Sequence, residues 1–182
     1  MKKLLIGITG RAGAGKTTAA EYIASHYYFN MYAFADPIKD GVAAMFGGDI
    51  GYAQGEAKEA VIPWLGKSSR QLQQLLGTEW GRNMVHPDLW INLAKREWDR
   101  IQARTANGLV IGDVRFDDEA KWIKDEGGYI LHLGRASHAP VASHISEQGI
   151  DPQYIDVMLQ NGTSLQMLYE RLDGVMSNLL DK

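Results

Sequence analysis

Cysteine is absent from the 182-residue sequence, which excludes disulfides, thiolate metal sites and a cysteine nucleophile. No apolar run reaches membrane-spanning length, and the run after Met1-Lys2-Lys3 ends at Ile8, too early for a secretory signal. Basic residues are not in excess: the net charge of −3 argues against a general nucleic-acid surface. We therefore expect a cytoplasmic protein with no membrane segment and no stable nucleic-acid partner.

What the chain does contain is a glycine-rich stretch, GRAGAGKTT, from Gly10 to Thr18. It has the pattern G-x-x-x-x-G-K-T, with an apolar strand-like segment before it and a helical pattern after it, as a phosphate-binding loop requires. Glycines let backbone N–H groups turn toward a polyphosphate, and the following helix adds a favourable dipole. We expect Lys16 to reach the β- and γ-phosphates and the Thr17 hydroxyl to bind Mg²⁺. The predicted nucleoside triphosphate site comprises Gly10, Ala12, Gly13, Ala14, Gly15, Lys16, Thr17 and Thr18.

Strand-like and helical patterns alternate along the chain. Strands are expected at about 3–8, 30–34, 109–113, 129–133 and 155–159. Near-continuous apolar strands separated by helices predict a doubly wound α/β fold in three layers, with a mostly parallel five-stranded sheet. About seventy residues separate the second strand from the third, and a structureless loop of that length is improbable in a compact domain. We therefore expect one domain over 1–182, with a core at about 1–46 and 106–182 and a mostly helical insertion at about 47–105.

Charged residues occur where the predicted strands end and in the predicted insertion. Asp113 closes an apolar strand, so it could hold a Mg²⁺-bound water or accept a proton beside the phosphate loop. Arg70 and Arg82 fall in the insertion, and Arg115 and Arg135 follow the third and fourth strands. Guanidinium groups suit bidentate phosphate binding and neutralisation of a migrating phosphoryl group. The GTPase pattern Asn-Lys-x-Asp does not occur. These observations favour a kinase whose acceptor carries a phosphate.

Four segments resemble motifs of the bacteriophage deoxynucleoside monophosphate kinases. They are FADPIK at 34–39, RQLQQLLGTEWGR at 70–82, DVRFDDEA at 113–120 and HISE at 144–147. Residues 155–168 resemble the closing strand and helix of that family. The resemblance implies a P-loop kinase core, a helical monophosphate-binding insertion and a small lid at about 134–150. It also implies transfer of the γ-phosphoryl group of ATP, with Mg²⁺, to a deoxynucleoside monophosphate, in the host cytoplasm if a phage encodes the chain. It hints at a homodimer.

Carried over position by position, the resemblance implies roles for residues at the ATP site and at the acceptor site. Lys16, Asp113, Arg115 and Arg135 are the catalytic candidates, with Thr17 and Asp113 at the metal. The lid also contains His138 and His144, which could contact phosphate. The acceptor-binding candidates are Asp36, Lys39, Arg70, Gln74, Trp80 and Arg82.

Three other functions stay open on the residues alone. A small-molecule kinase of the dephospho-coenzyme A kinase type would share the core and prefer another acceptor. A kinase acting on a base within phage DNA is disfavoured by the acidic net charge. A nucleotide-binding regulatory switch without an acceptor is disfavoured by the arginine-rich insertion.

Overall fold

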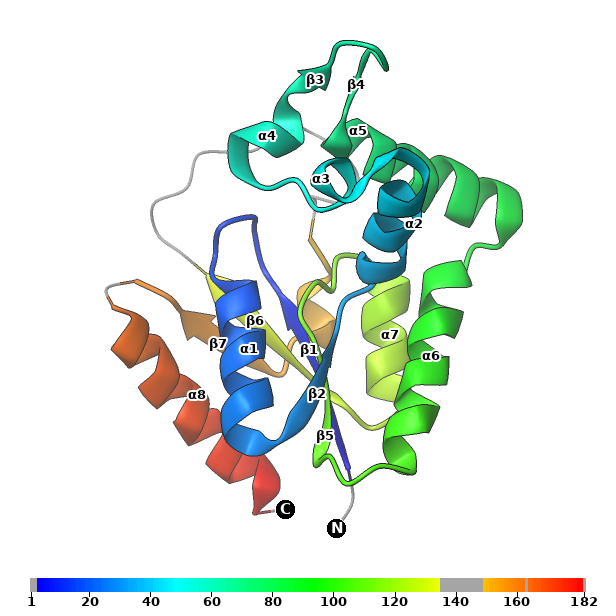
Figure 1. Cartoon of the computed structure of the whole chain (residues 1–182). Helices are drawn as coiled ribbons and strands as arrows, with labels where there is room; N and C mark the ends of the chain where they lie inside the picture. The colour runs from blue at the N-terminus through cyan, green and yellow to red at the C-terminus, as the bar shows by residue number, and fades with distance from the viewer. Residues whose placement is uncertain (1–2, 135–148, 163, 182) are drawn as a thin grey trace. The chain divides into compact units, whose positions relative to one another are not determined.

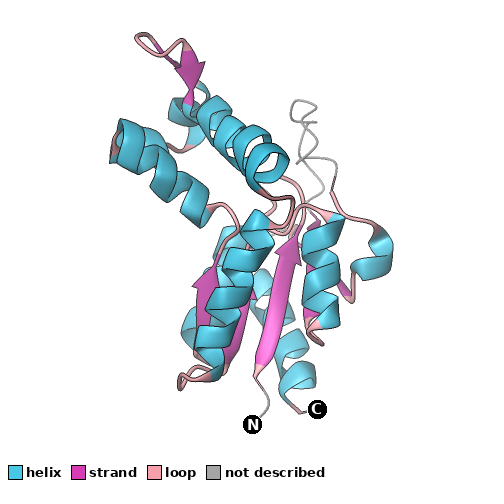
Figure 2. Ribbon diagram, turned by 90° about the vertical axis from the view of Figure 1, so that its right-hand side faces the viewer, coloured by secondary structure: helices cyan, strands magenta, loops and turns pink. Residues whose placement is uncertain are grey.

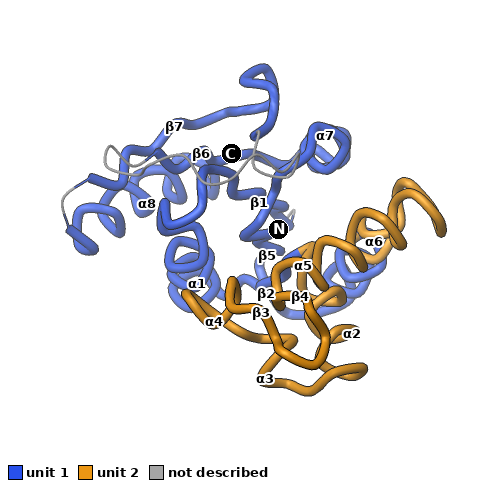
Figure 3. Tube along the Cα trace, turned by 90° about the horizontal axis from the view of Figure 1, so that it is seen from above, with its two compact units in different colours: residues 1–33, 95–182 blue, residues 34–94 orange. Residues whose placement is uncertain are grey.

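The chain forms two compact units, coloured separately in Figure 3. Unit 1 comprises Met1–Ala33 and Lys95–Lys182, and unit 2 comprises Phe34–Ala94. The computed structural model describes residues 3–134, 149–162 and 164–181. The expected insertion at about 47–105 overlaps unit 2, which begins earlier, at the end of the second strand, and ends inside a helix. Arg135, His138 and His144 of the expected lid lie outside the described residues.

Unit 1 is built on a five-stranded sheet of β1 (Leu4–Thr9), β2 (Phe29–Tyr32), β5 (Gly108–Ile111), β6 (Tyr129–Gly134) and β7 (Val157–Gln160). The strand order is β2-β5-β1-β6-β7, and each of the four strand pairings is parallel. This confirms the predicted α/β fold with a parallel five-stranded sheet. The last strand begins at Val157, two residues later than expected, after a short 3₁₀ turn at Pro152–Tyr154. All five strands therefore end at one edge, with β1 in the centre.

Helices cover both faces of this sheet, giving three layers (Figures 1 and 2). α1 (Lys16–Tyr27) and α8 (Leu165–Leu180) share one face, where Ile6, Ile8 and Leu131 are buried against them. α7 (Asp117–Asp125) covers the other face, where a Cβ on Gly7 of β1 would lie only 2.7 Å from a methyl group of Ile123. Such close approach of helix to sheet leaves room for no side chain at position 7.

A carboxylate links the two helices that share a face. Asp173 of α8 accepts hydrogen bonds from the hydroxyl groups of Tyr22 and Tyr27 of α1, at 2.8 and 2.6 Å. These bonds hold the pKa of Asp173 below its usual value. The helix that follows the phosphate loop is thus fixed to the helix that closes the chain.

Unit 2 is mostly helical, as the sequence predicts for the insertion. Its elements are α2 (Asp36–Phe46), α3 (Gly48–Gly51), α4 (Gly55–Glu59), the hairpin strands β3 (Val61–Ile62) and β4 (Lys67–Ser68), α5 (Ser69–Gln74), a π-helix (Leu75–Val85) and the start of α6 (Leu89–Gln102). Ser68 caps α5 through a reciprocal pair: its hydroxyl accepts from the Gln71 N–H at 3.3 Å, and the Gln71 side chain accepts from the Ser68 N–H at 2.9 Å.

The β3–β4 hairpin and the π-helix are elements of unit 2 that the sequence did not predict. Small residues let α6 approach the π-helix: the Trp90 indole N–H donates to the Gly77 carbonyl at 2.7 Å, and a Cβ on Gly81 would lie 2.4 Å from the same ring. Hydrogen bonds that span five residues change which side chains share a helical face. Within the described part of the chain, no helix is both long and apolar enough to cross a bilayer.

Candidate functional site

The phosphate loop joins the central strand β1 to α1. Gly10, Gly13 and Gly15 have φ values of 138°, 74° and 94°, a region that favours glycine. Gly10 also passes close to the neighbouring strand, since a Cβ there would lie 2.2 Å from the Leu133 carbonyl oxygen. The three glycines of the motif therefore meet a conformational requirement as well as a pattern, and the loop leads straight into the N-terminus of α1.

Lys16, the first residue of α1, bends back over the loop that precedes it. Its ammonium group donates to the carbonyls of Gly10 at 2.7 Å and Arg11 at 3.0 Å. A cation is thus positioned at the positive end of a 12-residue helix, where an anion is stabilised by both charge and dipole.

The turn after β5 lies beside the phosphate loop. The Gly112 N–H donates to the Tyr32 carbonyl at 3.1 Å, and the Val114 N–H donates to the Ile8 carbonyl at 3.0 Å. These bonds fix Asp113, between them in sequence, at the carboxyl edge of the sheet next to the end of β1. The sequence also predicts Asp113 at this corner, beside the phosphate loop.

The two residues predicted to bind Mg²⁺ both offer oxygen ligands. Thr17 supplies a hydroxyl and Asp113 a carboxylate, which are hard donors of the kind that Mg²⁺ prefers, while its remaining positions are commonly filled by water and phosphate. The described residues contain no group of three or more His, Cys, Asp or Glu that could hold a metal ion. The hydroxyl of Thr17 and the carboxylate of Asp113 are oxygen donors that fit Mg²⁺, and their role stays a prediction.

A buried carboxylate shapes the start of α7. Glu119 is 2% exposed, and its Oε2 accepts from the backbone N–H of Arg115 at 2.8 Å and of Phe116 at 3.2 Å. This side chain reaches back across the first turn of the helix and fixes the backbone that carries Arg115. Sequence reasoning treated Glu119 only as part of a motif, although an acidic residue in a helix's first turn is a known capping signal.

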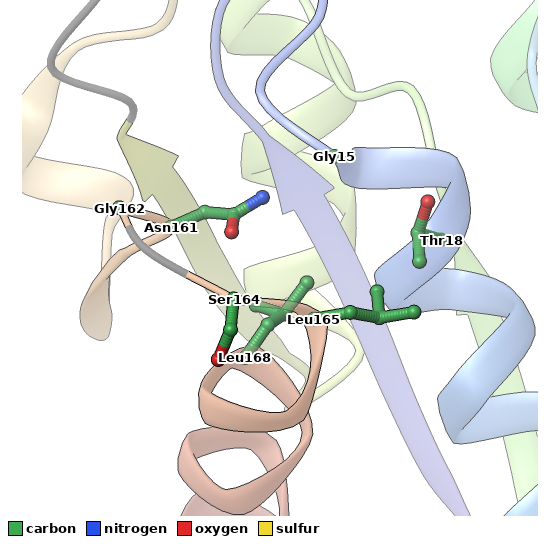
Figure 4. A pocket seen from close by; sticks show the side chains of 7 residues that line it. All are labelled: Gly15, Thr18, Asn161, Gly162, Ser164, Leu165 and Leu168. Carbon is green, nitrogen blue, oxygen red and sulfur yellow. The ribbon is translucent and has the colours of Figure 1, made fainter.

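A cavity of about 280 Å³ adjoins the phosphate loop in unit 1 (Figure 4). Its walls are Gly15, Thr18, Asn161, Gly162, Ser164, Leu165 and Leu168. Asn161 follows β7 directly, and its amide points toward the phosphate loop, donating to the Ala14 carbonyl at 2.9 Å. Sequence reasoning gave Asn161 no role. Its position directly after a strand, at the edge where the phosphate loop begins, was the available signal.

His132 is a second residue that sequence reasoning missed. It lies on β6 opposite Thr9, the residue before the loop. Burial lowers the pKa of His132 from its usual 6.5, and the positive charge of Lys16 lowers it further. Burial and the charge of the phosphate-loop lysine therefore both favour the neutral imidazole over the protonated one.

The predicted acceptor-binding residues all belong to unit 2, and each one has its own local setting. Asp36 begins α2 and pairs with Lys39 one turn later, at 3.2 Å. Arg70 and Gln74 lie on α5, four residues apart, and the Arg70 guanidinium is paired with Glu59. The contacts within unit 2 do not test whether these residues bind an acceptor, so their roles stay predictions.

Trp80 and Arg82 lie on the π-helix. Trp80 is 47% exposed, so it is not a core residue, and it lines an apolar cavity of about 880 Å³ between α2, the π-helix and α6. An exposed indole remains able to stack on a base, but the cavity it lines has almost no polar wall. Arg82 is partly buried.

Comparison with known proteins places this geometry in a family. Residues 53–172 match the deoxynucleotide monophosphate kinase family. A protein of Acanthamoeba polyphaga mimivirus, which bears the provisional name deoxynucleotide monophosphate kinase, is 32% identical over 187 residues, covering 96% of this chain and 97% of its own. The deoxynucleoside-5'-monophosphate kinase of Escherichia phage T5 is 30% identical over 113 residues, but the match spans 58% of this chain and 44% of the phage protein.

Solved structures support the fold. Dephospho-CoA kinase from Campylobacter jejuni aligns with a TM-score of 0.54 over 98% of both chains, at 12% identity. That likeness concerns the fold alone. The family match and the full-length viral relative go further: this chain belongs to the deoxynucleotide monophosphate kinase family.

Proposed function

We propose that this chain transfers the γ-phosphoryl group of ATP to a deoxynucleoside monophosphate, giving ADP and a deoxynucleoside diphosphate. The observation that carries the proposal is the phosphate loop of a family member: three glycines at positive φ, a lysine folded over them, and a helix N-terminus behind. Phosphoryl transfer requires mainly positioning and charge neutralisation, which such a loop supplies.

On the donor side, the loop amides and Lys16 bind the β- and γ-phosphates. The Thr17 hydroxyl, and Asp113 through a bound water, would hold Mg²⁺ with the nucleotide, and the metal would supply neutralisation of charge on the phosphates. Arg115, whose backbone is fixed by Glu119, and Arg135 neutralise the phosphoryl group during transfer. A phosphate acceptor is already ionised, so the reaction needs no strong general base.

On the acceptor side, Arg70 binds the acceptor phosphate, which replaces Glu59 as the partner of its guanidinium group. Asp36, Lys39 and Gln74 contact the sugar or base, with Trp80 and Arg82 nearby in the sequence. The Arg70 guanidinium is already paired with the Glu59 carboxylate, and a dianionic phosphate competes well for it. Action on free nucleotides fits a cytoplasmic location, and a homodimer stays a hypothesis that the size of the purified protein would test.

The reaction is tested by measuring ATP consumption with Mg²⁺ and each deoxy- and ribonucleoside monophosphate in turn. We expect ADP formation that depends on at least one deoxynucleotide. Lys16→Ala should lower the rate by about 100-fold or more, because it removes a charge from the transition state. Lys121→Ala, which removes an exposed lysine paired with Asp125, is the matched control. ATP loss without any acceptor would instead support the nucleotide switch.

The acceptor assignment has its own test. Arg70→Ala should raise the KM for the deoxynucleotide about tenfold or more while leaving the KM for ATP near its normal value, because charge-assisted bonds to phosphate are among the strongest. Arg100→Ala, which removes an exposed arginine paired with Glu97, serves as the control. An unchanged acceptor KM in the Arg70 variant would remove this residue from the site. Transfer to dephospho-coenzyme A and to no nucleotide would replace the proposed acceptor.

A further inference from the structure

Asn161 is held at two points where the sheet meets the phosphate loop. Its side-chain amide donates to the Ala14 carbonyl at 2.9 Å, and its backbone N–H donates to the Gly134 carbonyl at 2.7 Å. The second bond continues the ladder between β6 and β7, so the asparagine is anchored in the sheet. Because its backbone is anchored, the Asn161 side chain can restrict the orientation of the group to which it donates.

What Asn161 holds is one peptide plane of the loop. The Ala14 carbonyl and the Gly15 N–H belong to the same peptide unit, and in a planar trans peptide they point in opposite directions. The chain has no cis peptide bonds in its described residues. An amide that fixes the direction of the Ala14 carbonyl therefore also directs the Gly15 N–H away from Asn161.

Gly15 is matched to this arrangement. Its φ of 94° is costly for any residue with a Cβ, and a Cβ built there would lie 2.4 Å from the Asn161 amide nitrogen. The glycine thus allows both the turn of the peptide and the close approach of the amide. Without the amide, the same freedom would let the Ala14–Gly15 peptide rotate, because glycine restricts its own φ very little.

We propose that Asn161 is a positioning residue for the phosphate loop: by gripping the Ala14 carbonyl it presents the Gly15 N–H to the phosphates of the nucleotide donor. The proposal rests on the proposed function only in taking the bound anion to be a nucleoside triphosphate. Asn161 also forms a wall of the 280 Å³ cavity, so a direct contact with the nucleoside is the competing explanation for any loss of affinity.

The experiment separates these explanations with a ligand that has no nucleoside. Binding of inorganic tripolyphosphate and of ATP, each with Mg²⁺, is measured by titration calorimetry on the full chain and on Asn161→Ala and Asn161→Asp. The aspartate variant keeps the size of the side chain, cannot donate to the carbonyl, and stands in if the alanine variant does not fold. Asn178→Ala is the matched control, because Asn178 also donates to a backbone carbonyl at 2.9 Å, that of Gly174 on α8.

We expect Asn161→Ala to weaken ATP and tripolyphosphate equally, by about three- to tenfold, the loss of one hydrogen bond. Asn161→Asp should weaken both more, because its carboxylate faces a carbonyl oxygen and an anion. In turnover assays the KM for ATP should rise while the KM for the acceptor stays the same, which a general loss of folding would not produce. Asn178→Ala should change neither.

Two results would overturn the inference. If ATP weakens and tripolyphosphate does not, Asn161 contacts the nucleoside and does not position the loop. If neither weakens, the bond to Ala14 is structural only. Binding is read without turnover, so the inference can hold even where no monophosphate is phosphorylated, a result that would count against the proposed function alone.

Discussion

Replacing Gly10 by alanine tests how tightly the phosphate loop is built into the sheet. At φ 138° an alanine costs about 1–3 kcal/mol in backbone strain, and its Cβ would lie 2.2 Å from the Leu133 carbonyl oxygen. That oxygen belongs to β6, in the interior of the sheet, and cannot move aside as a flexible side chain would. We therefore expect a total loss of about 3–5 kcal/mol in the free energy of unfolding, and a melting temperature lower by about 10 °C.

Two other glycines of unit 1 separate strain from overlap. Gly149 has φ 83°, and no described residue lies within 4 Å of a Cβ built there, so Gly149→Ala should lose about 1–2 kcal/mol from strain alone. Gly174, inside α8, has neither problem, so Gly174→Ala should gain about 0.5–1 kcal/mol. Thermal unfolding followed by circular dichroism gives the order Gly174→Ala, wild type, Gly149→Ala, Gly10→Ala. A Gly10→Ala protein that melts at or above the Gly149→Ala temperature would refute the reasoning.

Two further outcomes concern the residues around the loop. Glu119→Ala leaves two backbone N–H groups without their carboxylate, so we expect a free energy of unfolding about 2 kcal/mol lower, measured by chemical denaturation. In steady-state kinetics we expect a lower kcat with little change in either KM. A kcat equal to that of wild type would show that the turn carrying Arg115 does not need this support. The pKa of His132, read by NMR, should lie below 6.5, and Lys16→Ala should raise it only in part, because burial is the larger cause. Since His132 binds a proton more readily in the unfolded chain, its contribution makes the fold less stable as pH falls below about 6.5 and has no effect above that value; a His132 pKa above 6.5 would reverse this sign.

The sequence was informative where a function depends on consecutive residues. The phosphate loop could be recognised because its strand, glycines, lysine and helix follow one another between Leu4 and Tyr27. Asp113 could be expected at the same corner because parallel strands end at one edge, and the bonds from Gly112 and Val114 place it there. Both inferences needed only local pattern and topology.

The roles of residues whose contact partners are distant in the sequence could not be predicted from local pattern. Asn161 meets Ala14 across 147 positions, and no local pattern specifies that contact. From the sequence, Trp80 fits either a base-stacking position or a core position, because a tryptophan near an apolar helical face is more often buried. The structure shows it half exposed, on a π-helix that the sequence did not predict. His132 looks like any residue of a buried strand until the strand order places it beside Thr9.

The bond pattern of Lys16 has a consequence for the thermodynamics of binding. A free lysine side chain loses up to about 2 kcal/mol of rotamer entropy when it is immobilised. Here the ammonium group is already tethered to the carbonyls of Gly10 and Arg11 before any nucleotide arrives. The incoming phosphates therefore exchange one set of acceptors for another on a side chain whose disorder was lost during folding. The immobilisation of this side chain should accordingly contribute little to the entropy lost on nucleotide binding. That entropy is lost on folding instead, where it lowers the free energy of unfolding.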